Sequence, residues 1–292
     1  MFFNGINCFT FRQLSFANNS KTQIWFTIKN IYSMEIDVKI KNIRVKLRQN
    51  SKEIIDDVLE RHVPKVSSKN RSKKEICVFC ASQYNLTKEH VLPRWTFENC
   101  NKKFFVTGIN GSEQSYNKTT IPVCADCNNN LLANIESYII SIFKETDLST
   151  SFFNDEQLQN IIRWLEIIEY KFQLLEIRRK FIKSKSVQYI EYLRDIPVSI
   201  MRADIDYSPS RAVTQIRIAQ KRVTEKSKVR NQNSLVVFKT KNESFYFFHH
   251  LNDFIFLELP KFGIALFYFY SRTFENVEAA KDEAMKVIKE VY

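Results

Sequence analysis

The pattern of apolar and polar residues along the chain predicts a mixture of helices and strands. Apolar residues recur at helical spacing in four segments, which are 51–63, 125–143, 155–183 and 273–291. Polar residues that favour the first position of a helix precede or open three of them, namely Ser51, Asn154 and Thr273. Gln157 follows Asn154 by three residues, which is the spacing of a capping box. We therefore expect four helices, with the longest over 155–183.

Other segments alternate with a period of two or are rich in β-branched and aromatic residues, which is typical of strands. These are 35–45, 104–107, 119–123, 235–238, 245–248, 254–257 and 264–270. Turn residues separate the last four, so they predict an antiparallel meander. Asn110-Gly111 marks a tight turn after 104–107. The basic segment 211–230 is interpreted as an edge strand and loop. The predicted fold class is α+β.

Length and composition limit the class of protein. The chain has 292 residues, of which 44% are hydrophobic and 14% aromatic, enough to form a sizeable core. Its formal net charge of +12 indicates a polyanionic partner, either nucleic acid or an anionic membrane surface. No apolar run approaches the roughly 18 residues of a spanning helix, so we expect nucleic acid and no membrane.

Two Cys-x2-Cys pairs are the clearest chemical motif. Cys77 and Cys80 form the first pair, and Cys124 and Cys127 form the second, with 43 residues between them. Four thiolates in two such pairs predict a tetrahedral zinc site, which is structural because it keeps no position open for substrate. Zinc thiolates beside the two remaining cysteines, Cys8 and Cys100, fit a reducing cytoplasm better than a secreted protein.

The residues between and after these pairs resemble a known enzyme family. The run Glu89-His90-Val91-Leu92-Pro93 lies between the cysteine pairs, and Asn128 follows the last cysteine. This order resembles the zinc-stapled HNH endonucleases, whose core is a treble-clef-like ββα-metal unit. The resemblance covers about sixty of the 292 residues.

The resemblance implies a specific chemistry. It makes His90 the general base, with Glu89 and Asn128 holding a catalytic Mg²⁺ or Mn²⁺. Glu89 stands where many members have Asp, so its role is open between cation ligand and orienter of His90. Asn117 is the nearest candidate for a residue that steadies the base, and Glu136 is interpreted as a solvated helix acid or an outer-shell group. The implied activity is metal-dependent hydrolysis of nucleic acid, with DNA expected first, in phage defence, restriction or mobile elements.

Basic side chains provide candidate contacts for the nucleic acid. They lie beside the Glu-His pair and in the 211–230 segment, and they are Lys88, Arg94, Arg211, Arg217, Lys221, Arg222, Lys226 and Lys228. Solvated surface charge is the alternative interpretation, as it is for the basic stretch 65–74. His249 and His250 are neighbours that a strand would point to opposite faces, so we interpret them as structural.

The patterns divide the chain into three parts. Residues 1–75 form an extension and basic linker, 76–145 the zinc-bearing core, and 146–292 an α+β accessory domain that determines substrate choice or binds a second copy or partner protein. Met34 could be the true start of the chain, or the residues before it could form a short extension that bears a strand.

Three classes of function compete on these residues. They are a metal-dependent endonuclease, a zinc-stabilised nucleic-acid-binding module without cleavage, and a structural zinc domain of a larger assembly. A purely structural four-cysteine module does not need the Glu89-His90 pair, so the pair favours the endonuclease.

Overall fold

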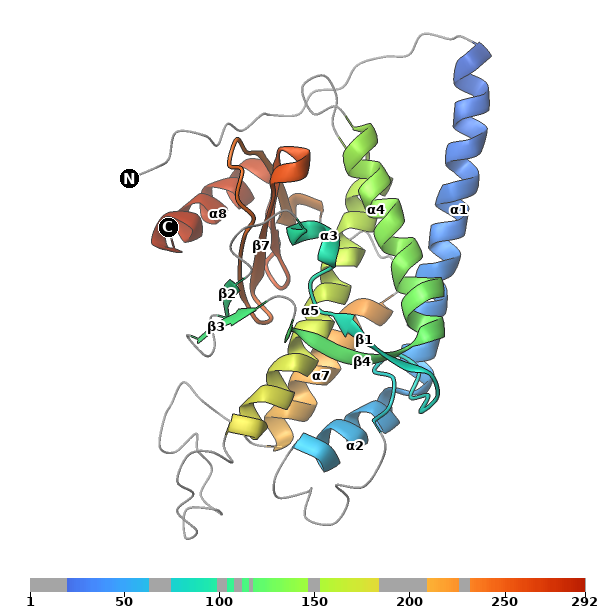
Figure 1. Ribbon diagram of the computed structural model, residues 1–292. Coiled ribbons are helices and arrows are strands. Elements are labelled where there is room, and N and C mark those ends of the chain that lie inside the picture. Colours follow the sequence, from blue (N-terminus) through green and yellow to red (C-terminus); the bar gives the residue numbers. More distant parts are fainter. Residues whose placement is uncertain are drawn as a thin grey trace.

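The computed structural model of the protein describes residues 20–62, 75–98, 104–107, 112–115, 118–146, 153–183, 209–225 and 232–291. The helices in order are α1 (Ser20–Gln49), α2 (Ser51–His62), α3 (Arg94–Phe97), the π-helical turn η2 (Asp126–Leu132), α4 (Ala133–Glu145), α5 (Asp155–Lys183), α7 (Pro209–Thr224) and α8 (Val277–Val291). The strands are β1 (Leu86–His90), β2 (Phe104–Thr107), β3 (Ser112–Ser115), β4 (Thr120–Cys124), β5 (Leu235–Lys239), β6 (Tyr246–His250), β7 (Phe254–Leu259) and β8 (Ile264–Phe269) (Figure 1). Short 3₁₀ turns cover Gln232–Ser234 and Pro260–Phe262.

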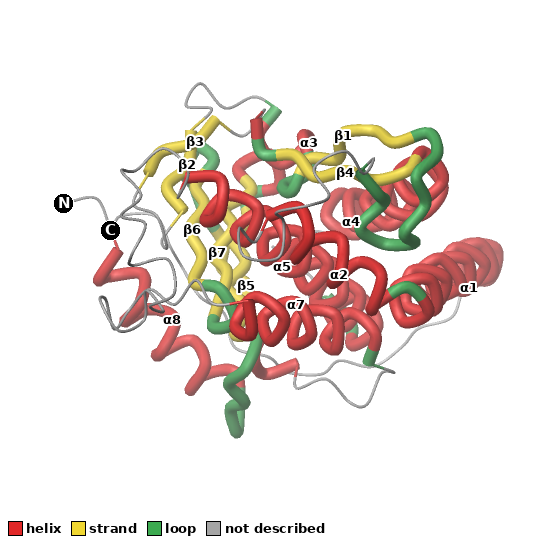
Figure 2. The backbone as a smooth tube through the Cα atoms, turned by 90° about the horizontal axis from the view of Figure 1, so that it is seen from below, coloured by secondary structure: helices red, strands yellow, loops and turns green. Residues whose placement is uncertain are grey.

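Helix α5 is the central element of the fold. Figure 2 shows it with the β1–β4 pair on one side, α7 on the other, and the C-terminal sheet beside it. Between Gln157 and Ile177 all residues except Gln159 and Arg163 are buried, so the helix is covered all round rather than along one stripe. The predicted capping box is confirmed: Asn154 Oδ1 accepts the Gln157 N–H at 2.9 Å, and Gln157 Oε1 accepts the Asn154 N–H at 2.9 Å.

The C-terminal strands form one antiparallel sheet in the order β5-β8-β7-β6. Strands β6, β7 and β8 make the predicted meander, whereas β5 joins the far edge, beside β8. One face contributes side chains such as Leu257 and Leu266 to the main core around α5. The other face packs Phe256 and Phe267 under Ala284 of α8, so both faces of the sheet are covered.

The prediction of a strand over 35–45 is wrong, because these residues belong to α1. Ile36, Ile40, Ile43 and Leu47 are buried, and their spacing of four, three and four residues is that of one helix face. Val38 is 53% exposed and Val45 is 41% exposed. The apolar residues on alternate positions therefore mimicked a strand although two of them face solvent.

The interpretation of 211–223 as an edge strand is also wrong, because these residues form most of α7. Four residues at helical spacing form its buried face, namely Ala212, Ile216, Ala219 and Val223. Two alanines, whose small side chains add little to the apolar pattern, complete this stripe. Helix α7 packs along α5 and also contacts α1 and α2.

Two predicted helix caps differ from the observed ones. Ser51 donates its hydroxyl to Gln220 Oε1 of α7 at 2.6 Å, which ties α2 to α7. Asn276 rather than Thr273 caps α8, since its Oδ1 accepts the Ala279 N–H at 2.8 Å. Tertiary packing therefore determines the partner of Ser51, whereas the cap of α8 lies three residues after the predicted one.

One continuous cluster of buried side chains joins the N-terminal, cysteine-bearing and C-terminal segments. Trp95 of α3 stacks on Trp164 of α5 with ring centroids 5.5 Å apart, and its ring also lies edge-on to Phe262 at 5.9 Å. Phe143 of α4 packs against the same rings. The described parts of the three predicted segments therefore share a core, and their division into domains stays a prediction.

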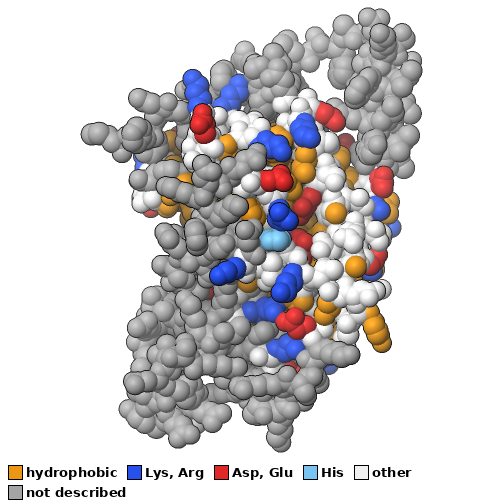
Figure 3. All heavy atoms as spheres, in the orientation of Figure 1, with side chains coloured by type: hydrophobic (Ala, Val, Ile, Leu, Met, Phe, Trp, Pro, Cys, Tyr) orange, Lys and Arg blue, Asp and Glu red, His pale blue; other side chains and the backbone are white. Residues whose placement is uncertain are grey.

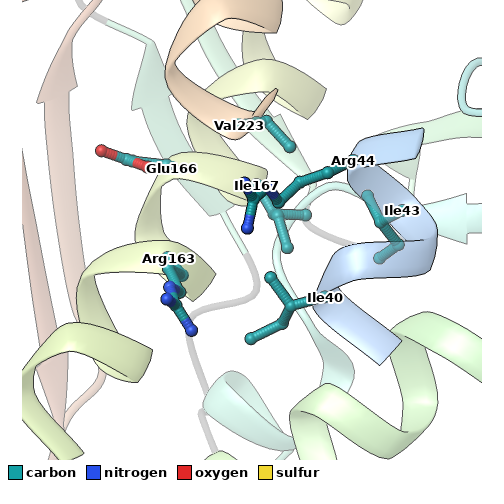
Figure 4. Close-up of a pocket in the computed structure, with 7 residues that line it drawn as sticks. All are labelled: Ile40, Ile43, Arg44, Arg163, Glu166, Ile167 and Val223. Carbon is teal, nitrogen blue, oxygen red and sulfur yellow. The ribbon is translucent and has the colours of Figure 1, made fainter. Parts of the chain in front are cut away.

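A small cavity lies where α1, α5 and α7 meet (Figure 4). Its volume is about 10 Å³, which admits one water molecule at most. Arg44 reaches it from α1 and Arg163 from α5, and Arg163 Nη1 donates to Asp37 Oδ1 at 2.7 Å. The cavity is a packing defect between helices and is too small for an organic ligand. None of the described helices is both long and apolar enough to cross a bilayer.

His249 lies in the core between aromatic rings. Its ring centroid is 4.3 Å from that of Phe172 on α5 and 5.2 Å from that of Phe247. Neither ring nitrogen has a hydrogen-bond partner among the described residues. Burial, and secondarily the charge of His250, lowers the pKa of His249 to about 3, so this imidazole is neutral in the folded protein. His250 is exposed, as alternation along β6 requires.

We expect His249→Phe to reduce the acid sensitivity of the protein. In the unfolded chain a histidine gains a proton below its usual pKa of about 6.5, whereas the folded protein keeps His249 neutral down to about 3. The stability that depends on neutral His249 is therefore complete above pH 6.5 and is lost as the pH falls toward 3.

Urea unfolding of both proteins at pH 7.5 and pH 5 measures this effect. Between pH 7.5 and pH 5, the free energy of unfolding of the wild type should fall by about 2 kcal/mol more than that of His249→Phe. Other titrating groups, such as Glu169, are present in both proteins and cancel in the difference. Parallel pH profiles would contradict the neutral, buried assignment of His249.

Candidate metal centre and Glu-His strand

The first cysteine pair lies in a tight loop held by backbone hydrogen bonds. The Cys77 N–H donates to the Ser82 carbonyl at 2.8 Å, and the Ala81 N–H donates to the Cys77 carbonyl at 2.9 Å. Ala81 has a φ of 57°, which closes the loop in the left-handed region. The Tyr170 hydroxyl of α5 donates to the Val78 carbonyl at 2.6 Å, so the central helix fixes this loop.

The second cysteine pair spans the junction between β4 and the helix that follows it. Cys124 ends β4, and Cys127 lies in the first turn of η2, which continues into α4. The Val78 N–H donates to the Pro122 carbonyl at 3.1 Å, which joins the two cysteine-bearing segments. Because β1 pairs with β4, the order of this unit is strand, strand, helix.

The structure brings the four cysteines together. The Sγ atoms of Cys77, Cys80, Cys124 and Cys127 all lie within 4.8 Å of one another. The Cys80 and Cys124 sulfurs are 3.6 Å apart, close to the edge of about 3.8 Å that a tetrahedron with Zn–S bonds near 2.3 Å requires. The donor set and its spacing fit zinc. Across the described ranges, no other group of three or more Cys, His, Asp or Glu lies close enough to share a metal ion.

Hydrogen bonds between the crowded thiols separate their pKa values. Bonds from Cys127 and Cys77 lower the pKa of Cys80, whereas the same contacts and burial raise the pKa of Cys127. A cation that binds thiolates displaces their protons to solvent, so metal binding at such a cluster is favoured as the pH rises.

A cation from α1 lies beside the cysteine cluster. Lys46 Nζ contacts Asp126 Oδ2 of η2 at 3.1 Å. The hydrogen bond to Asp126 raises the pKa of Lys46, and the negative charges of Cys127 and Cys80 contribute to the shift. Lys46 therefore offsets part of the negative charge that a four-thiolate site carries. No local pattern in the sequence indicates this contact, because Lys46 and Asp126 are 80 residues apart and meet only when α1 packs beside η2.

His90 ends β1 opposite Thr120 of β4. Its side chain is partly exposed, and its ring centroid is 6.5 Å from that of Phe97 on α3. On the face shown in Figure 3, lysine and arginine side chains are interspersed with acidic side chains over the middle of the molecule. The chain bends directly after this residue, at Val91 and Leu92, and Pro93 precedes α3.

Glu89 faces the opposite way, into the protein. It is 8% exposed, and its Oε1 lies 2.7 Å from the Nζ of Lys171 on α5. Lys171 also donates to the His90 carbonyl at 2.9 Å and lies 4.0 Å from Glu136 Oε1. Burial raises the pKa of Glu136 to about 7, against the opposing effect of Lys171, so Glu136 is not a freely solvated acid.

Lys171 is a site residue that sequence analysis missed. The one available signal was a lysine in the middle of an apolar helix, between Tyr170 and Phe172. A lysine in such a helix is usually a surface residue on the polar face. Only the burial of α5 on all sides makes it internal.

Asn128 lies on η2 and contacts Thr87 of β1. Its Nδ2 donates to Thr87 Oγ1 at 2.9 Å, and Thr87 Oγ1 donates to the Val123 carbonyl at 2.8 Å. These bonds fix the helix start to both strands. The amide nitrogen makes this contact, which leaves Oδ1 as the oxygen that could meet a cation.

The predicted nucleic-acid contacts divide into groups. Lys88 and Arg94 are exposed next to the Glu-His pair, on β1 and at the start of α3. Arg211, Arg217 and Lys221 are exposed on α7, which lies across α5 from β1 (Figure 2). Arg222 instead donates to Asn252 Oδ1 at 3.1 Å and lies over the Tyr270 ring.

Several predicted residues lie outside the described part of the chain. These are Lys226, Lys228, Asn117, Cys8, Cys100, the Asn110-Gly111 turn and the basic stretch 65–74.

Comparisons with known proteins do not assign the chain to a family. No protein-family model matches it, and neither the curated proteins nor the solved structures contain a match. The functional interpretation therefore depends on the residues and their geometry.

Proposed function

We propose that the protein is a metal-dependent endonuclease that hydrolyses phosphodiester bonds in nucleic acid, with DNA as the first expected substrate. One observation carries the proposal: a histidine ends the first strand of a strand-strand-helix unit that is held together by four clustered cysteines. A site with only a structural purpose has no use for a partly exposed histidine at that strand end. The order of parts is also the order in the zinc-stapled HNH endonucleases that the sequence resembles.

His90 supplies the base in this proposal. Its imidazole removes a proton from the attacking water, which needs a group that titrates near neutral pH. A divalent cation, when bound, would stabilise charge on the phosphate oxygens. Asn128 offers Oδ1 for such a cation on the helix that follows β4. The four cysteines take no part in the reaction and hold β4, η2 and the first loop in place.

Surface charge supports a nucleic-acid substrate. The chain carries a net charge of +12, and Lys88 and Arg94 are exposed beside His90. Cations at these positions would contact phosphates near the scissile bond. Defence against phage, restriction and mobile-element mobility are the settings in which a stand-alone nuclease of this kind would act.

The second candidate is a zinc-stabilised module that binds nucleic acid without cutting it. The position of Glu89 favours this candidate, because its carboxylate is paired with Lys171. In the described ranges, no cluster of three or more acidic or histidine side chains surrounds His90 as a preformed cation site.

Nicking of supercoiled plasmid by the zinc-loaded protein, with and without Mg²⁺ or Mn²⁺, tests the proposal. We expect cleavage that needs the added cation, and binding that weakens steeply between 50 and about 200 mM salt. Single-stranded DNA and RNA in parallel reactions identify the preferred substrate. Salt-sensitive binding with no cleavage of any of the three would favour the binding module.

A further inference from the structure

Lys171 contacts two consecutive residues of β1. Its side chain is 1% exposed, and its Nζ lies 2.7 Å from Glu89 Oε1 and 2.9 Å from the His90 carbonyl oxygen. One acceptor is a side chain and the other is backbone, so the ammonium fixes both the inward residue and the main chain of the outward one. Charge-assisted hydrogen bonds of this kind are stronger than neutral ones.

The position of these contacts determines where His90 points. Consecutive strand residues face opposite sides, so the inward direction of Glu89 sets the outward direction of His90. His90 is the last residue of β1, and the chain bends at Val91, which lies beyond the β1–β4 ladder. Thr119 accepts the Val91 N–H at 2.9 Å on the β4 side, while Lys171 holds the strand end from the α5 side.

We propose that Lys171 is a positioning residue that orients the His90 strand end, and that Glu89 acts as its partner instead of as a ligand of the catalytic cation. This inference rests on the proposed nuclease function. One oxygen of the Glu89 carboxylate, Oε1, is bonded to a buried ammonium, and removing that pairing would leave an uncompensated charge. The C-terminal part of the chain therefore contributes to the site through α5.

Glu136 of α4 completes the surroundings of Lys171. Its Oε1 is 4.0 Å from Lys171 Nζ, which is too far for a hydrogen bond. Lys171 thus bonds to β1 and has only a charge interaction with α4. The two β1 acceptors are the contacts that substitution would remove.

Two variants separate positioning from cation binding. Glu89→Gln keeps an oxygen that Lys171 can bond to but removes the charge that a cation would need. Lys171→Met removes both bonds to β1. Arg178→Met is the matched control, because it breaks another ion pair of α5, with Glu75 at 2.6 Å, that does not touch the Glu-His pair.

The experiment measures turnover and the Mn²⁺ concentration for half-maximal cleavage, well below each variant's unfolding temperature. We expect the turnover of Lys171→Met to fall about tenfold or more. The turnover of Glu89→Gln should also fall, but by less. The Mn²⁺ requirement of both should stay within about twofold of wild type, as should the turnover of Arg178→Met. If Lys171→Met does not retain zinc, Glu89→Gln alone decides between the two roles.

A tenfold higher Mn²⁺ requirement in Glu89→Gln would make Glu89 a cation ligand and overturn the inference. Unchanged turnover in Lys171→Met would overturn it as well, leaving only a core ion pair. If the wild type cuts nothing, the proposed function fails separately. The NMR signals of the His90 ring, assigned by their absence in His90→Ala, then decide. A changed chemical shift in Lys171→Met but not in Arg178→Met supports positioning, and an unchanged chemical shift in both contradicts it.

Discussion

Replacing Cys124 with serine should release the metal and unfold the strand-strand-helix unit. Cys124 is 5% exposed and ends β4, and its sulfur lies 3.6 Å from that of Cys80. Serine offers no thiolate, so one corner of the tetrahedron is lost. Structural zinc contributes on the order of 10 kcal/mol to the folding of small zinc domains, which exceeds the total stability of many proteins.

Zinc content by elemental analysis and thermal unfolding by circular dichroism measure this effect. Wild type should carry one zinc per chain, and Cys124→Ser close to none, with unfolding at a much lower temperature. Cys100→Ser serves as the control because it makes the same change outside the two pairs. A Cys124→Ser protein with full zinc content and the wild-type transition would refute the four-cysteine site.

His90→Ala should abolish cleavage while leaving the fold and the zinc intact. Loss of a general base costs about 10²- to 10⁴-fold in rate. His90 is partly exposed at a strand end, and the contact with Lys171 uses its carbonyl oxygen, which alanine retains. The truncation therefore removes the imidazole and little of the packing.

His250→Ala is the matched control for this variant. His250 is an exposed strand histidine on β6, and its substitution should leave the cleavage rate within about twofold of wild type, as expected for a surface change. Zinc content and salt-dependent DNA binding are compared in all three proteins. Equal cleavage by wild type and His90→Ala would remove His90 as the base.

The parts of the structure that local signals determine were predictable. The helix over 155–183 is set by a capping box and a long apolar pattern, and the structure has both. The grouping of four cysteines follows from the spacing within each pair, because each Cys-x2-Cys loop can occupy one edge of a tetrahedron. The C-terminal strands were separated by turn residues that mark their ends.

The wrong elements are those in which two periods fit the same residues. In 35–45, apolar residues at Ile36, Val38 and Ile40 satisfy a strand, but burial selects Ile36, Ile40 and Ile43. In α7, two alanines complete the buried face, and alanine does not distinguish a strand from a helix by its polarity alone. Tertiary packing decided both cases, as it commonly does where local propensity is a weak signal.

The environment of the Glu-His pair could not be predicted from local sequence. Lys171 is separated from Glu89 by 82 residues, and only the burial of α5 on all sides brings the two together. Lys46 likewise reaches Asp126 from 80 residues away. Partners at such separations depend on the packing of α1 and α5 against the cysteine-bearing unit, which no spacing rule in the sequence encodes.

These long-range contacts change how the proposed site should be manipulated. Tyr170 and Lys171 reach the first cysteine loop and β1 from α5, and Lys46 reaches η2 from α1. A fragment limited to 76–145 would lose all three contacts. Experiments on the site therefore require the full chain.

Plasmid nicking by the zinc-loaded full-length chain, with wild type and His90→Ala followed in parallel after addition of Mn²⁺, tests the central claim most directly. We expect the wild type to convert supercoiled plasmid to the nicked form only when the cation is added, and the variant to remain inactive with its zinc retained. Cleavage by both proteins at the same rate, or by neither despite intact zinc and DNA binding, would contradict a nuclease centred on His90.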